Sequence, residues 1–142
     1  MTEVAFHFNV PHKLGYACRL LRKATAAGTR VGVVAPPETL RELDVALWSF
    51  SALDFIAHCD AAAPADVLER TPIVLASDCT ALPNAGVLVH LGGDVPAGFE
   101  RFERLIELVG ADDQDRAQAR LRWRHYAERG FAIQRHDLAT KE

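Results

Sequence analysis

"RVGVVAPPETLRELDVAL", residues 30–47, contains a buried type of strand followed directly by an amphipathic helix. Residues 30–35 form a short β-branched run without alternating polar positions, which is typical of a strand covered on both faces. Two prolines then stand where a helix begins. Leu40, Leu43 and Leu47 recur at helical spacing, so one face of this helix should contact the core. The segment therefore predicts one strand–helix unit of an α/β protein.

The same alternation continues on both sides of this unit. The other expected strands are 4–10, 72–77 and 86–91, with a weaker one at 54–59 and a final extended piece at 131–138. The other expected helices are 12–27, 65–71, 98–109 and the arginine-rich segment that Gly130 ends. Strands that alternate with helices imply βαβ units and a mostly parallel sheet with helices on both faces. The length of 142 residues fits a single domain over 1–142.

The helix expected over residues 98–109, "GFERFERLIELV", rests on helical periodicity alone. Its apolar side chains fall on one stripe of a helical wheel, namely Phe99, Phe102, Leu105, Ile106 and Val109.

Nucleotide-binding patterns are missing from the first strand-to-helix turn, "HFNVPHKLGY" (7–16). It has neither G-x-G-x-x-G nor G-x-x-x-x-G-K-[ST], so there is no glycine-lined nest for a phosphate. The six histidines show no metal-binding spacing. We therefore expect no cofactor, no metal and no catalytic residue. The Gly92–Gly93 pair and Cys79, which follow expected strands, keep open the alternative of a small enzyme on a degenerate nucleotide-binding fold.

Composition narrows the class of protein further. A net charge of -3 and a pI near 6.1 argue against broad binding to nucleic acid, so any positive site must be local. Cys18, Cys59 and Cys79 form no C-x-x-C pair and are expected to be small buried side chains in a reducing compartment. We see neither a signal peptide nor a membrane-spanning run, and expect a cytoplasmic protein.

A local positive site is indicated by "DRAQARLRWRHYAERGF", residues 115–131, which carries five arginines. On a helical wheel the side expected to face the protein holds Ala119, Trp123, Tyr126 and Ala127. A row on the shoulder of that side holds Arg116, Arg120 and Arg124. The side expected to face water holds Gln118, Arg122, His125 and Arg129.

Two explanations of the arginine row remain open at this point. The row repels itself by a few tenths of a kcal/mol per pair, so an anionic partner with carboxylates for the guanidinium forks would stabilise it. Alternatively it is a solvated helix face, neutralised by Asp112, Asp113, Asp115 and Glu128.

A second feature is the group of large aromatics in "LDVALWSFSALDFIAH", residues 43–58. Trp48, Phe50 and Phe55 come at the end of the leucine-striped helix and just beyond it. Aromatics in such places are enriched at protein–protein interfaces, although they also close over sheet edges.

At these segments the sequence resembles the chi subunit of bacterial DNA polymerase III holoenzyme, and the match covers nearly the whole chain. It rests on "LDVALWSF" with "FIAH", on "VLVHLGGDVPAGFERFERLIELV" and on "RAQARLRWRHYAERGF". Two departures are visible: Ala57 stands where the family often has proline, and Trp123 replaces a more usual tyrosine. The aromatic wall is thereby kept and a hydroxyl is lost.

The resemblance implies a non-catalytic Rossmann-like α/β protein with two protein partners. One is the psi subunit, which tethers chi to the clamp loader. The other is the acidic C-terminal tail of single-stranded-DNA-binding protein, which ends in an apolar residue and a free carboxylate. The psi surface would centre on Trp48 and Phe55. The tail site implied by the resemblance consists of Val109, Arg116, Arg120, Trp123 and Arg124.

Overall fold

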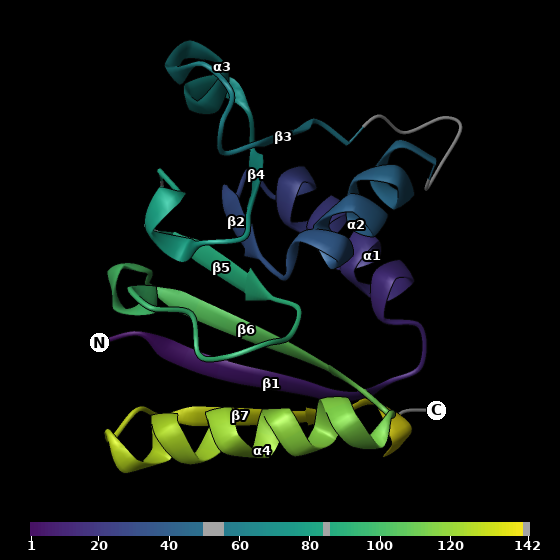
Figure 1. Ribbon diagram of the computed structural model, residues 1–142, viewed down its shortest axis with the longest axis vertical. Helices are drawn as coiled ribbons and strands as arrows, with labels where there is room; N and C mark the ends of the chain where they lie inside the picture. Colours follow the sequence, from purple (N-terminus) through teal and green to yellow (C-terminus); the bar gives the residue numbers. More distant parts are fainter. Residues whose placement is uncertain (50–55, 84–85, 141–142) are drawn as a thin grey trace.

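The computed structural model describes residues 1–49, 56–83 and 86–140 (Figure 1). In chain order the elements are β1 (Glu3–Val10), α1 (Lys13–Ala26), β2 (Val31–Val34), α2 (Pro37–Ser49), β3 (His58–Asp60), α3 (Ala65–Arg70), β4 (Ile73–Ala76), β5 (Val87–His90), β6 (Arg104–Gly110), α4 (Asp113–Glu128) and β7 (Ile133–Asp137). Short 3₁₀ turns cover Cys79–Ala81, Phe99–Arg101 and Leu138–Thr140.

All seven strands join one sheet, in the order β3-β4-β2-β5-β6-β1-β7. Every paired neighbour runs parallel. The expectation of an α/β protein with a parallel, Rossmann-like sheet is confirmed. β7 is an edge strand and pairs with β1 so that Phe6 lies beside Arg135.

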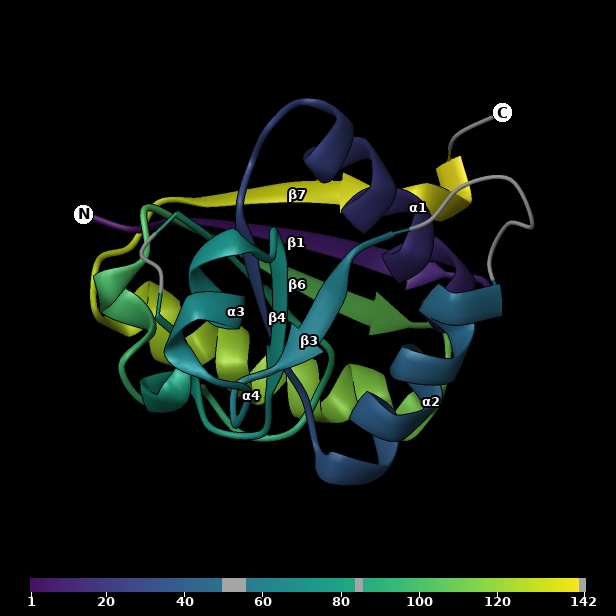
Figure 2. The ribbon, with the colours of Figure 1, turned by 90° about the horizontal axis from the view of Figure 1, so that it is seen from above.

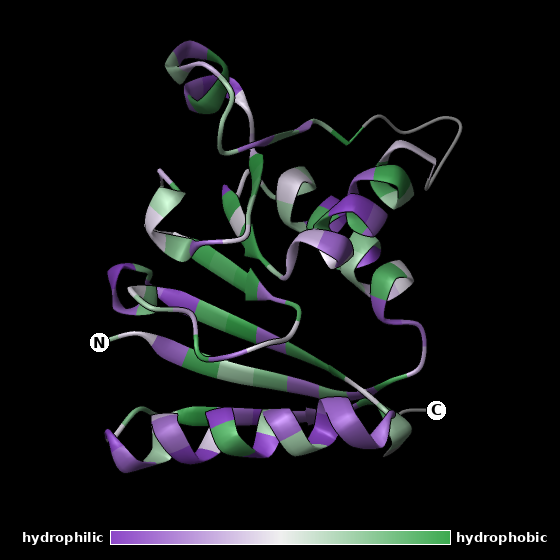
Figure 3. Cartoon of the chain, in the orientation of Figure 1, coloured by the Kyte–Doolittle hydropathy of each residue, from purple (hydrophilic) through white to green (hydrophobic). Residues whose placement is uncertain are grey.

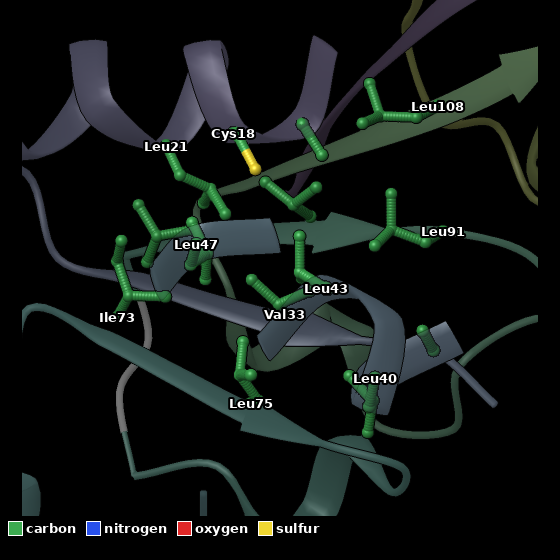
Figure 4. Close-up of a cluster of buried hydrophobic side chains, with 14 of the residues drawn as sticks. Cys18, Leu21, Val33, Leu40, Leu43, Leu47, Ile73, Leu75, Leu91 and Leu108 are labelled. Atoms are coloured by element: carbon green, nitrogen blue, oxygen red, sulfur yellow. The ribbon is translucent and has the colours of Figure 1, made fainter. Parts of the chain in front are cut away.

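Helices cover both faces of the sheet, as predicted (Figure 2). α1 and α2 bury a cluster against one face, in which Leu21, Leu43 and Leu47 pack on Val33 and neighbouring strand residues (Figure 4). α4 covers the other face and packs through buried side chains against β1 and β6, at the end of the sheet where β7 lies (Figure 1). Strict alternation along each strand assigns its side chains to these two faces.

The helix predicted over residues 98–109 is wrong. Phe99–Arg101 forms a short 3₁₀ turn, and Arg104–Gly110 is the strand β6, paired with both β1 and β5. A strand buried on both faces shows no polar alternation, so its apolar run imitated a helical stripe. In the strand, Leu105 and Val109 face α4, whereas Ile106 and Leu108 face α1 and α2.

The other predicted elements are found within one or two residues of their expected ends, apart from the weak strand at 54–59. There the structure places β3 at His58–Asp60, and residues 54–55 lie outside the described ranges. In the part of the chain that is described, no helix combines the length and the apolar character needed to cross a bilayer.

Candidate functional site

The arginine-rich segment forms α4, the longest helix of the structure. Asp112 caps its start, where its carboxylate accepts a hydrogen bond from the Asp115 backbone N–H at 3.0 Å. Gly130 follows its end in a left-handed conformation, with φ 81°. Hydrophilic residues run along most of the helix, while the central strands are mostly hydrophobic (Figure 3). Its apolar contacts with the sheet come from a narrow stripe, in which the Trp123 and Tyr126 rings pack on Phe6 of β1.

A buried polar cluster around Glu107 of β6 also fixes the orientation of α4 about its own axis. The Arg122 Nε donates to Glu107 Oε1 at 2.9 Å, and the Tyr126 hydroxyl donates to Oε2 at 2.6 Å. His90 of β5 hydrogen-bonds Oε1 through Nδ1 at 2.8 Å. Glu107 is 0% exposed, so each of these bonds forms away from water, where it is electrostatically stronger. Two side chains of α4 are thus tied to one carboxylate in the sheet.

The cluster shifts the protonation of its members in opposite directions. Burial raises the pKa of Glu107, but the charge and hydrogen bond of His90, the charge of Arg122 and the Tyr126 hydroxyl together hold that pKa below its usual value. Burial and the neighbouring Glu107 carboxylate raise the pKa of Tyr126 far above the ordinary tyrosine value. The cluster is therefore stable with a charged carboxylate and a neutral phenol.

The helical wheel erred at two positions of α4. Arg122, predicted to face water, is 1% exposed, whereas Ala127, predicted to face the protein, is exposed. The buried stripe runs through Ala119, Arg122 and Tyr126 because Glu107 provides a buried partner for a guanidinium. This rotation affects the arginine row: Arg124 precedes Tyr126 by two residues, about 200° around the helix at ~100° per residue. Arg124 is therefore exposed on the side remote from the sheet.

A cavity of about 420 Å³ opens between α4 and the strands β1, β6 and β7. Its apolar lining comes from both layers: Phe6 and Phe8 of β1, Val109 of β6, and Ala119 and Trp123 of α4. Its charged lining consists of arginines, namely Arg116, Arg120 and Arg135, and Asn9 adds an amide.

The aromatic rings of the cavity contact one another and one of these arginines. The ring centroids of Phe6 and Trp123 are 5.0 Å apart. The guanidinium carbon of Arg135 lies 5.6 Å from the Trp123 centroid and 5.7 Å from the Phe8 centroid, within cation–π range. The cavity therefore has an aromatic wall and a strongly positive rim.

In the described part of the chain, the acidic residues near the arginine row form no ion pair with Arg116 or Arg120. Asp115 instead pairs with Lys13 Nζ at 2.9 Å and accepts from the Gly110 N–H at 2.7 Å. Asp112 caps the helix. Among the described residues, no carboxylate forms an ion pair with Arg116 or Arg120.

Four of the five residues predicted for the tail site come together around this cavity: Val109, Arg116, Arg120 and Trp123. The fifth, Arg124, is not among the lining residues. Sequence reasoning missed Phe6, Phe8 and Arg135. A signal for Arg135 was available, since it stands two residues after Ile133, and alternation puts both side chains on the α4 face of an expected extended segment.

The aromatic surface predicted near residue 48 is only partly described. Trp48 is 59% exposed and stands three residues after Val45, which is 65% exposed, so the two lie on one outward face of α2. The Trp48 ring lies 5.1 Å from the ring of His58, whose Nε2 contacts the Asp44 carboxylate at 2.9 Å. Phe50 and Phe55 lie outside the described residues.

The Gly92–Gly93 turn and Cys79, on which the alternative of an enzyme rested, are respectively bonded to α4 and buried. The Gly93 carbonyl accepts from Arg122 Nη1 at 2.8 Å, which ties the Gly92–Gly93 turn to α4. Cys79 is 2% exposed, and burial raises the pKa of its thiol, so little of the reactive thiolate forms. Neither feature forms a reactive centre.

Fold and site together define the class: a parallel α/β protein whose accessible cavity combines aromatic rings with guanidinium groups that form no ion pair with any carboxylate of the described residues. Such a cavity suits an anionic partner with an apolar group. Comparison with known proteins then gives the family. The family model for "DNA polymerase III chi subunit, HolC" matches residues 1–134, and the chain belongs to this family. It is also 34% identical to the DNA polymerase III subunit chi of Pseudomonas aeruginosa over 144 aligned positions, which cover 97% of this chain and 98% of that protein.

Membership makes the chain an accessory subunit of DNA polymerase III, with a part in DNA replication. This agrees with the expectation that the chain has no catalytic activity of its own. As a subunit, it has at least one partner in the polymerase complex.

Proposed function

We propose that this chain, acting in the cytoplasm as a single domain, joins the clamp loader to DNA coated with single-stranded-DNA-binding protein. One surface binds the psi subunit, and the α4 cavity binds the acidic C-terminal tail of the binding protein. The observation that carries the proposal is the cavity itself, with an apolar lining and three arginines on its rim.

The chemistry of the tail matches the two kinds of lining. Its apolar final residue would pack against Trp123, Phe6 and Val109, and its carboxylates would meet Arg116 and Arg120. Each charge-assisted hydrogen bond contributes about 1.5–3 kcal/mol when it is shielded from water. Because these two arginines have no carboxylate partner among the described residues, no intramolecular ion pair has to break first.

Exchange of the tail follows from the exposure of the same groups. Arg116 and Arg120 are exposed, so salt screens their attraction to the tail. A coated strand displays many tails, and this multivalency raises the effective affinity without any new contact. This chain would therefore bind a coated strand tightly, while each single tail still dissociates and exchanges.

The psi surface is proposed around Trp48 of α2, and Phe55, which lies outside the described residues, is proposed as a second residue of this surface. Trp48 and Val45 offer apolar area that is already outside the core. α2 packs on the opposite face of the sheet from α4. Binding of psi and binding of the tail therefore do not compete for the same side chains, as a bridge requires.

Direct binding of DNA by the same arginines is the rival reading, and the net charge of -3 disfavours it. A nucleotide-dependent enzyme is the other alternative, and it predicts a rise in melting temperature with common nucleotides. The proposed function predicts neither direct retention of single-stranded DNA nor a nucleotide shift.

A titration of a labelled acidic tail peptide tests the proposal. Arg120→Ala should weaken binding about tenfold or more, whereas Arg129→Ala, which removes an exposed arginine outside the cavity, should leave it unchanged. Equal affinities for wild type and Arg120→Ala would refute the site.

A further inference from the structure

The positive rim of the cavity comes from two separate elements. Arg116 and Arg120 project from α4, whereas Arg135 belongs to the edge strand β7. The register of β7 with β1 places Arg135 beside Phe6 in the sheet. The positive groups thus flank the aromatic lining on both its helical and its strand side.

Arg135 is held in place by rings. Its guanidinium carbon lies 5.7 Å from the Phe8 centroid and 5.6 Å from the Trp123 centroid, so the side chain spans an aromatic from each layer. Within the described ranges, no carboxylate forms an ion pair with it, and it is exposed. A guanidinium whose faces rest on rings still has its N–H groups free at the edges to bind an anion.

The place of Arg135 on the edge strand determines which part of a ligand it can contact. Val109 and Asn9 lie near the carboxyl ends of β6 and β1, inside the sheet, whereas β7 is the outermost strand. β7 forms the open edge of the sheet beside the cavity, and Arg135 lines the cavity from this edge. A chain whose apolar tip packs on Val109 and Trp123 and that leaves the cavity across β7 brings its upstream residues past Arg135.

We infer that Arg135 is a specificity-determining residue that binds a side-chain carboxylate upstream of the apolar tip, while Arg116 and Arg120 bind the terminal carboxylate. The inference rests on the proposed function and assigns the side-chain and terminal carboxylates of the acidic tail to different arginines. The partner's tail has to be acidic before its last residues, and a lone free carboxylate after an apolar residue binds more weakly.

The test is a set of titrations with three short labelled peptides that share an apolar C-terminal residue. The first peptide has aspartates upstream of this residue and a free C-terminus. The second has asparagines in place of the aspartates and keeps the free C-terminus. The third keeps the aspartates and has an amidated C-terminus. For the first and third peptides, Arg135→Gln should weaken binding about fivefold. For the asparagine peptide, wild type and variant should bind equally.

Two control variants separate charge recognition from loss of structure. Arg135→Lys keeps the charge and should retain part of the preference for aspartate over asparagine, although it loses the cation–π contact of the guanidinium with Trp123 and the paired N–H donors. Arg129→Gln removes a positive charge outside the cavity and should change no affinity.

The outcomes distinguish this inference from the proposed function. Binding of the acidic peptide with equal affinity by wild type and Arg135→Gln contradicts the inference alone. An effect of Arg135→Gln that persists with asparagines and disappears with the amidated end also contradicts it, because Arg135 would then bind the terminal carboxylate. No binding of the acidic peptide by wild type contradicts the proposed function, and with it this inference.

Discussion

Arg122 of α4 and Glu107 of β6 form an ion pair that is closed off from solvent, with 2.9 Å between Nε and Oε1. The two residues are 1% and 0% exposed. The pair ties the otherwise hydrophilic α4 to the sheet and thereby orients the arginines and Trp123 that line the cavity. The geometry of the proposed binding cavity therefore depends on an ion pair whose two residues are not part of the cavity lining.

Arg122→Ala should destabilise the protein strongly. The change leaves the Glu107 carboxylate buried without its guanidinium and removes the hydrogen bond to the Gly93 carbonyl. Removing one partner of a buried pair costs about 3–5 kcal/mol. Urea unfolding measures the loss, and Arg129→Ala serves as the exposed control, with an expected change of about 0.5 kcal/mol or less. A loss for Arg122→Ala no larger than that of the control would disprove the anchoring role.

The stabilisation by Glu107 should depend on pH in a defined direction. Its folded pKa is held below the unfolded value of about 4.3, so the contribution is complete above that value. It is lost as the pH falls through the folded pKa. The difference in unfolding free energy between wild type and Glu107→Gln should therefore shrink as the pH falls below about 4. A difference that is the same at pH 3 and pH 7 would contradict the pKa direction.

The alkaline limit of stability should come in part from Tyr126. Its folded pKa is raised, so the folded state favours the neutral phenol; the stabilisation is present below the unfolded pKa of about 10 and is lost as the pH rises above it. The part of the tyrosinate absorbance that Tyr126→Phe removes should therefore appear together with unfolding, and not as a separate step near pH 10, whereas Tyr16 contributes equally to both proteins. Tyr126→Phe should lower stability at neutral pH by about 1.5–3 kcal/mol and flatten the alkaline decline. Ionisation of Tyr126 in the folded protein near pH 10 would count against the account.

The arginine row should matter for binding and not for folding. Arg116 and Arg120 repel each other across one helical turn, and no ion pair with a described carboxylate offsets this repulsion. Arg120→Gln should therefore leave the unfolding free energy within about 0.5 kcal/mol of wild type, or raise it slightly. Chemical denaturation checks this. A clear destabilisation would mean that Arg120 is part of the structural framework.

The errors made from sequence have one physical origin. The strands 30–35, 72–77 and 86–91 and the helix with Leu40, Leu43 and Leu47 follow from local patterns, and the structure contains them. β6 was read as a helix because pairing with β1 and β5 is not a local property. The helical wheel placed Arg122 towards water because a wheel takes no account of the buried carboxylate of Glu107 on a neighbouring strand.

The candidate site shows the same limit. Val109, Arg116, Arg120 and Trp123 were chosen through a family resemblance together with a helical wheel, and three of the four lie on one helix. Alternation with Ile133 assigns Arg135 to one face of its strand, but its place beside Phe6 depends on the register of β7 with β1, which is not a local property of the sequence. A glutamate inside an apolar run such as "LIELV" (105–109) is the signal that could have shown that a buried cation was needed.

The proposed bridge requires one molecule of this chain to hold psi and a protein-coated strand at the same time. Immobilised psi, single-stranded DNA coated with the binding protein, and this chain test it in one binding assay. Wild type should retain the coated strand on psi. Trp48→Glu should lose psi but keep the tail peptide, and Arg120→Ala should lose the strand but keep psi. Two results would contradict the proposed bridge. In one, immobilised psi retains the coated strand when this chain is absent. In the other, psi retains as much coated strand with Trp48→Glu and with Arg120→Ala as with wild type.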